Sequence, residues 1–202
     1  MLEFSSGLAN CQNLSFLNID FQSNDITGQG LKDLCQGLIR CTKLQSLTLN
    51  LSCNKIEEKY AHDIGKLIAN YENLTKLALI LDCNKIDYDC IQQIGQALQK
   101  YKKLLNLKLS FRDNFENNAI KGLALALTKC SELATLNLSF QSSKITYQGV
   151  QGLLQNLQKC VKLQTISVFI RPRKIKKSHK KKLIQTSLKF KRQVNKPSII
   201  IQ

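Results

Sequence analysis

Residues 44–56 read LQSLTLNLSCNKI, and the chain carries five copies of this type of stretch. The copies begin at Leu14, Leu44, Leu74, Leu104 and Leu133. Their starts are separated by 30, 30, 30 and 29 residues, and a degraded sixth copy begins at Leu163. A fixed period of this length predicts a solenoid, because each unit is too small to bury its own apolar face and must stack on its neighbours.

Each copy contains the signals of a strand, a turn and a helix. Leu47 and Leu49 alternate with Thr48 and Asn50, which is the period of a strand with one buried face. In the first four copies an asparagine follows the strand, where its amide can bond backbone groups that the strand leaves open. These asparagines are Asn24, Asn54, Asn84 and Asn114. Positions 61, 64 and 68 are then apolar, at the i, i+3, i+7 spacing of one buried helical face.

Over residues 14–170 these units resemble leucine-rich repeats of the ribonuclease-inhibitor type, with a strand, a helix and a late cysteine in each coil. The number of residues between the strand and the asparagine is two greater than is usual in that family. The resemblance implies an α/β horseshoe, with parallel strands on the concave face and helices on the convex face. The 29-residue copy is predicted to lose its residue in the loop between Phe111 and Ile120, where a deletion costs least.

The charge divides the chain into two regions. Residues 1–170 hold 18 basic and all 14 acidic residues, whereas residues 171–202 hold 12 basic residues and no acidic ones. We therefore expect a solenoid over residues 1–170, with a partial first repeat, five full repeats and the start of a sixth. Residues 171–202 are expected to form a basic, degraded repeat that acts as a cap or tail, with a final edge strand at 197–201. Because the chain enters halfway through a helix, we expect a truncated solenoid rather than a dimer interface.

The eight cysteines do not predict a disulfide framework. The slot three residues before each opening leucine holds either a cysteine or a tyrosine. Its occupants are Cys11, Cys41, Tyr71, Tyr101, Cys130 and Cys160. Such a slot requires a partly buried side chain and no covalent bond. Cys53 and Cys83 occupy equivalent turns and could meet in stacked coils, but a reducing compartment disfavours their disulfide. Without paired Cys-x-x-Cys and histidine ligands, we expect no structural zinc, and no cofactor or metal.

The sequence favours a protein without catalytic activity. It contains none of the glycine-rich phosphate loops, dinucleotide fingerprints or nucleophile elbows that mark common enzyme sites. His62 and His179 have no nucleophile nearby in sequence and are expected to be surface residues. The longest apolar run, at residues 77–81, is too short to span a membrane, and the first residues do not resemble a secretion signal. We expect a cytoplasmic or, alternatively, a nuclear protein with no small-molecule substrate.

The first functional hypothesis is a scaffold that binds a protein partner through the concave strand face. The outward positions of the strands are small, polar and nearly neutral, which suits a protein surface better than a polyanion. The candidate contacts are Phe16, Asn18, Asp20, Ser46, Thr48, Asn50, Lys76, Ile80, Asn106, Lys108, Ser110, Thr135, Asn137 and Ser139.

The second hypothesis is a module in which the basic tail contacts nucleic acid or acidic lipid. Its candidate residues are Arg171, Arg173, Lys176, Lys177, Lys180, Lys181 and Lys182. The tail has almost no aromatic residues, which weakens the case for sequence-specific RNA binding. A third hypothesis, a regulator of a small GTPase with Arg112 or Arg171 as its arginine, is implied only by the family resemblance.

Overall fold

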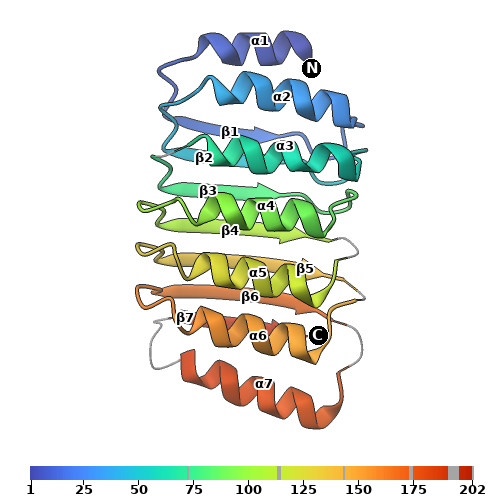
Figure 1. The fold of residues 1–202 in the computed structure, drawn as a ribbon, viewed down its shortest axis with the longest axis vertical. Coiled ribbons are helices and arrows are strands. Elements are labelled where there is room, and N and C mark those ends of the chain that lie inside the picture. The colour runs from blue at the N-terminus through green and yellow to red at the C-terminus, as the bar shows by residue number, and fades with distance from the viewer. Residues whose placement is uncertain (72, 113–114, 143, 173–174, 191–195, 202) are drawn as a thin grey trace.

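The computed structural model describes residues 1–202 except 72, 113–114, 143, 173–174, 191–195 and 202. Throughout the described residues, helices and parallel strands alternate and form two separate layers (Figure 1). The helices are α1 (Leu2–Asn10), α2 (Gly28–Ile39), α3 (Glu58–Ala69), α4 (Tyr88–Leu98), α5 (Asn117–Leu127), α6 (Tyr147–Leu157) and α7 (Lys177–Phe190). The strands are β1 (Phe16–Asp20), β2 (Ser46–Asn50), β3 (Lys76–Ile80), β4 (Asn106–Phe111), β5 (Thr135–Gln141), β6 (Thr165–Arg171) and β7 (Lys196–Ile201).

The strands lie in one parallel sheet in chain order, β1 to β7. The register follows the repeat, so that Leu47 pairs with Leu77 thirty residues later. Between β4 and β5 the offset becomes 29, and Leu107 pairs with Leu136. The interval from Phe111 to the start of α5 is one residue shorter than the matching interval in the next coil. The deletion therefore lies in the loop where it was predicted.

The core lies between the two layers and runs through the whole stack. Leu49 and Leu79 are completely buried, as the alternation predicted, and Leu34 and Leu38 of α2 belong to the same buried cluster. Phe111 and Phe140 stack in neighbouring coils with ring centroids 5.9 Å apart, which adds a rigid aromatic contact to the aliphatic core. The hydrophobic effect of this shared interior holds the coils together.

Two of the turn asparagines, Asn54 and Asn84, tie their coil to the preceding one, whereas the Asn24 side chain donates to Gln22 in its own coil. Asn54 donates from Nδ2 to the carbonyl oxygens of Leu51 and Phe21, at 2.8 and 2.9 Å. Its Oδ1 accepts a 2.8 Å bond from the amide of Ile26 in the preceding coil. Asn84 repeats the arrangement one coil later. The predicted role of these side chains is confirmed at both positions, whereas Asn114 lies outside the described residues.

The slot that accepts cysteine or tyrosine is a hydrogen-bond position. Tyr71 and Tyr101 donate from their hydroxyls to carbonyl oxygens at the end of the preceding helix, and the Cys41 and Cys130 thiols do the same. Both residue types bring an apolar body and one donor, which is what a buried helix C-terminus requires. None of the eight cysteines forms a disulfide.

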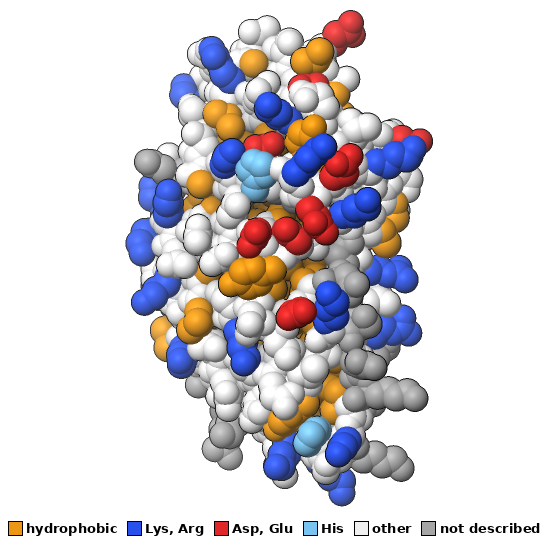
Figure 2. Space-filling view, turned by 45° about the vertical axis from the view of Figure 1, so that its right-hand side comes forward, with side chains coloured by type: hydrophobic (Ala, Val, Ile, Leu, Met, Phe, Trp, Pro, Cys, Tyr) orange, Lys and Arg blue, Asp and Glu red, His pale blue; other side chains and the backbone are white. Residues whose placement is uncertain are grey.

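The C-terminal region continues the same stack. Strand β7 pairs in parallel with β6, which confirms the predicted edge strand, and Leu183 of α7 is buried against the core. Figure 2 shows basic side chains over the whole height of the viewed face, whereas the acidic ones lie in its upper and middle parts and are not seen at its lower end. The uneven charge of the sequence is therefore an uneven charge of the surface.

Candidate functional site

The predicted contact residues lie on the concave face, meaning the side of the sheet turned away from the helices. Their accessibility varies along the stack. The exposed ones are Phe16, Asn18, Asp20, Lys76, Asn106 and Lys108, and the half-buried ones are Ser46, Thr48, Asn50, Ile80, Thr135, Asn137 and Ser139. Ser110 lies on this face but is only 5% exposed. The alternation of apolar and polar residues thus predicted the correct face for these side chains, but it did not predict how exposed each of them is.

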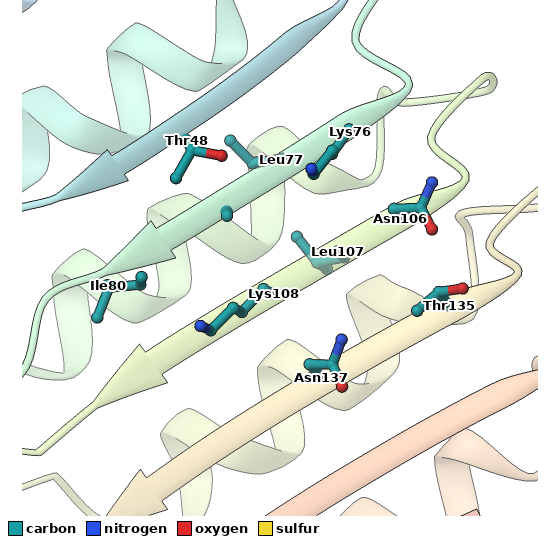
Figure 3. A pocket seen from close by; sticks show the side chains of 10 residues that line it. Thr48, Lys76, Leu77, Ile80, Asn106, Leu107, Lys108, Thr135 and Asn137 are labelled. Carbon is teal, nitrogen blue, oxygen red and sulfur yellow. The ribbon is translucent and has the colours of Figure 1, made fainter. Parts of the chain in front are cut away.

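A hollow of about 440 Å³ lies on this face and crosses strands β2 to β5. Thr48, Asn106, Thr135 and Asn137 contribute polar groups, and Ala78 and Ile80 contribute apolar surface. Two lysines, Lys76 on β3 and Lys108 on β4, complete it, and Leu77 and Leu107 also line it (Figure 3).

The hollow exists because a small residue stands between larger ones. In the parallel register Ala78 pairs with Thr48 on one side and with Lys108 on the other. Its methyl group leaves a depression that a longer side chain would fill. The surrounding sheet is held rigidly by the buried leucines of the same strands. The sequence analysis did not predict this depression. The sequence did contain an indication of it, because Ala78 is smaller than Thr48 and Lys108 at the equivalent positions of the neighbouring repeats.

The two lysines are the charged groups of the hollow, and neither forms an ion pair within the described residues. Acidic groups on this side of the sheet are engaged elsewhere. The Ser110 hydroxyl donates its one proton to the carboxylate of Asp82, whose two oxygens both lie 2.9 Å from Oγ, and Asp20 accepts a bond of 3.0 Å from Asn50. The hollow therefore offers two ammonium groups beside apolar surface, a combination that complements a negatively charged group carried by an apolar segment.

Ser110 differs from the other predicted contact residues in its environment. Its hydroxyl is bonded to both carboxylate oxygens of Asp82, and its side chain is almost entirely covered. This bond links the end of β4 to the turn after β3, so that Ser110 stabilises the rim of the concave face. A partner approaching that face would meet Lys108 rather than Ser110.

The basic tail forms a second, separate surface. Arg171, Lys176, Lys181 and Lys182 are exposed around the start of α7. The His179 ring of the same helix stacks on Tyr147, with 4.2 Å between ring centroids. The side chains of Lys177 and Lys180, and the whole of Arg173, lie outside the described residues. Of the seven predicted tail contacts, the structure thus shows four as exposed residues.

Nowhere in the described part of the chain do three or more histidine, cysteine or acidic side chains gather as they would around a metal ion. The imidazole Nε2 of His62 lies 3.5 Å from the carboxylate of Asp63, the next residue of α3. Within these residues, none of the helices combines the length and apolar character needed to cross a bilayer.

Comparison with solved structures agrees with the architecture. The chain is similar to leiomodin-1 actin-binding site 2, with a TM-score of 0.56 and 19% identity over 95% of each chain. It also aligns with the tropomodulin C-terminal domain of Caenorhabditis elegans, with a TM-score of 0.49 and 9% identity over 95% of this chain and 97% of that one. No protein-family model and no curated protein matches the sequence. The repeat period, the parallel sheet and the leiomodin likeness define a leucine-rich repeat solenoid of the α/β class.

Proposed function

We propose that this chain is a non-enzymatic interaction scaffold of the ribonuclease-inhibitor type, which binds a protein partner through its concave face. The single observation that carries this proposal is the hollow beside Lys76 and Lys108. Two ammonium groups without ionic partners in the described residues flank the apolar side chains of Ala78 and Ile80. A partner segment that carries an acidic side chain among apolar ones complements this arrangement in both charge and polarity.

The size of the face supports a protein partner. Seven parallel strands at a spacing of about 4.8 Å form a surface about 30 Å wide, which is sufficient for a standard interface of about 800 Å² per partner. The half-buried threonine and asparagine side chains around the hollow supply both hydrogen-bond donors and acceptors. Side chains that are already partly immobilised lose little entropy when a partner binds.

The test compares two double variants in affinity capture from cell extract, with the captured proteins identified at low salt. The first is Lys76→Ala with Lys108→Ala. The matched control is Lys32→Ala with Lys129→Ala, which removes the same charge from exposed positions outside the sheet. We expect the first pair to weaken binding of a captured partner by about tenfold or more, and the control pair to leave it within about twofold. Equal binding by both variants would contradict a site at the hollow.

Purified actin is one defined partner for the same comparison, since the leiomodin-1 chain of similar fold is an actin-binding site by its name. Sedimentation with actin filaments and fluorescence titration with actin monomers would measure this directly. Actin binding that depends on Lys76 and Lys108 would identify the partner. Actin binding that is indifferent to both lysines would place its contact elsewhere on the chain.

The uneven surface charge favours a second candidate, contact of the tail with a polyanion such as nucleic acid or acidic lipid. Arg171, Lys176, Lys181 and Lys182 are exposed together, and residues 171–202 contain no acidic side chain. Polyanion binding weakens steeply with salt because condensed counterions are released on binding. A steep loss of binding in salt, removed by Lys→Gln changes at 176, 181 and 182, would support this candidate. Deletion of the tail is a poorer test, because β7 is part of the sheet.

A further inference from the structure

Cys53 and Cys83 occupy equivalent places in neighbouring coils, in the turns that follow strands β2 and β3. Both have a left-handed backbone, with φ of 54° and 55°, and both are exposed. The amide of Cys53 donates to the carbonyl oxygen of Asp82 at 2.8 Å, and that of Cys83 to Arg112 at 3.3 Å. The parallel ladder thus continues past the strands and holds the two turns side by side.

These backbone bonds place the side chains of Cys53 and Cys83 next to each other in neighbouring coils. Partial burial raises the pKa of the Cys83 thiol, and the neighbouring Cys53 thiol raises it further. Arg112 opposes this effect and favours the thiolate. Adjacent parallel strands are about 4.8 Å apart, and disulfides join residues whose Cα atoms are about 4.4–6.8 Å apart. The backbone therefore needs little movement to accommodate a bond between the two sulfurs.

Two other pairs of cysteines also lie in neighbouring coils, and their thiols are engaged differently. The Cys41 and Cys130 thiols are buried and donate to carbonyl oxygens at 3.3 and 3.2 Å. Their partners Cys11 and Cys160 also donate to backbone carbonyls. Burial raises the pKa of Cys130 to about 12 and that of Cys160 to about 11, so the reactive thiolate form is scarce. These two pairs therefore serve as internal controls for a redox reaction of Cys53 and Cys83.

We propose that Cys53 and Cys83 form a reversible dithiol site that reacts with low-molecular-weight disulfides such as oxidised glutathione. The thiolate of one cysteine attacks the glutathione disulfide, forms a mixed disulfide and releases one glutathione thiolate. The second cysteine, as its thiolate, attacks the protein sulfur of the mixed disulfide, closes the Cys53–Cys83 bond and releases the second glutathione. Two protein thiols are oxidised, one disulfide is reduced to two thiols, and the two thiol protons pass to the released glutathione.

This reaction would join the turns after β2 and β3, next to the strands that carry Thr48 and Ile80 of the hollow. It would also close a covalent loop of one repeat, which restricts the unfolded chain. The oxidised protein should therefore unfold at a higher urea concentration than the reduced one. The inference does not depend on which partner the concave face binds.

The experiment equilibrates the whole chain with glutathione buffers of increasing oxidation, followed by acid quenching, alkylation and peptide mass mapping. We expect the wild type to lose two alkylatable thiols together and to yield a cross-linked peptide containing Cys53 and Cys83. Cys53→Ser and Cys83→Ser should each lose this cross-link and carry one glutathione adduct on the remaining cysteine. Cys11→Ser and Cys160→Ser should behave as the wild type.

Two results would overturn the proposal. One is a wild type in which Cys53 and Cys83 each hold a stable glutathione adduct and no mutual cross-link, because the second attack would then not occur. The other is preferential cross-linking of Cys11 to Cys41 or of Cys130 to Cys160. A urea midpoint that rises on oxidation in the wild type, but in neither serine variant at 53 or 83, would support the bond independently of mass mapping.

Discussion

The hydroxyl of Tyr71 donates a hydrogen bond of 2.8 Å to the carbonyl oxygen of Leu38, which lies in the last turn of the preceding coil's helix. One coil earlier, the thiol of Cys41 makes the same kind of contact with Leu8 at 3.3 Å. A phenol and a thiol thus perform one task at equivalent positions, with the larger side chain filling more of the interior. The contact joins successive coils at the end where each helix leaves carbonyl groups open.

Removal of the Tyr71 hydroxyl should weaken the stack modestly. Tyr71→Phe keeps the ring and loses the donor, while Leu38 still accepts a bond from the amide of Cys41. We expect a loss of about 1 kcal/mol in the free energy of unfolding, measured by urea denaturation. Tyr88→Phe, at an exposed tyrosine, is the control and should change stability by less than about 0.5 kcal/mol. Equal effects would show that the Tyr71 bond contributes nothing.

The change of glycine to alanine should have opposite effects on stability at Gly37 and at Gly122. A Cβ on Gly37 would lie 2.4 Å from the backbone oxygen of Ser5, so Gly37→Ala must displace α1 from α2. We expect a loss of about 1–3 kcal/mol, together with faster proteolysis within α1. Gly122 meets nothing within 4 Å, and Gly122→Ala should stabilise α5 by about 0.5–1 kcal/mol. Two stabilising substitutions would mean that α1 does not pack closely at Gly37.

Substitution of a turn asparagine should cost more stability than substitution of an exposed polar residue. Asn84 is buried and donates to the carbonyl oxygens of Leu51 and Leu81 at 2.9 and 3.1 Å. Asn84→Ala leaves these groups without that donor, and we expect a cost of about 2–3 kcal/mol in urea denaturation. Asn18→Ala, on the exposed concave face, is the matched change and should cost less than about 0.5 kcal/mol. Similar losses of stability for Asn84→Ala and Asn18→Ala would contradict the proposed role of the turn asparagines in joining the coils.

The buried thiols predict a loss of stability at alkaline pH. Burial, aided by the charge of Cys160, raises the pKa of Cys130 from 9.0 to about 12, and burial raises that of Cys160 to about 11. Above pH 9 the unfolded chain releases these protons while the folded chain keeps them, so rising pH favours unfolding until the folded thiols also ionise. Each such group contributes up to about 1.4 kcal/mol per pH unit in this window.

The measurement is urea denaturation at several pH values between about 9 and about 11. Cys130→Ala should lower the stability at pH values below 9 and reduce its further decline above 9. Thr42→Ala changes an exposed side chain that does not titrate and should leave the slope of the wild type unchanged. An identical slope in the Cys130 variant would mean that this thiol ionises equally in both states.

The hollow illustrates the limit of reasoning from one sequence. Alternation placed Thr48, Ala78 and Lys108 on the same face, and the repeat period indicated which of them are neighbours. The depression depends on their relative sizes after the strands are aligned. The accessibility of Ser110 depends on a contact with Asp82, which follows a different strand. Both features arise from distances between coils, and the pattern of one coil does not contain them.

By itself, the sequence determined the solenoid, the direction of the strands and the inward positions of leucines such as Leu49, because a repeated apolar pattern has only one face to bury. It also placed Cys53 and Cys83 in equivalent turns. Only the tertiary structure decided that those two turns lie side by side, while the thiols of Cys41 and Cys130 bond to backbone carbonyls. The physical reason is that periodicity specifies which positions are equivalent, whereas contact and burial depend on how closely successive coils pack.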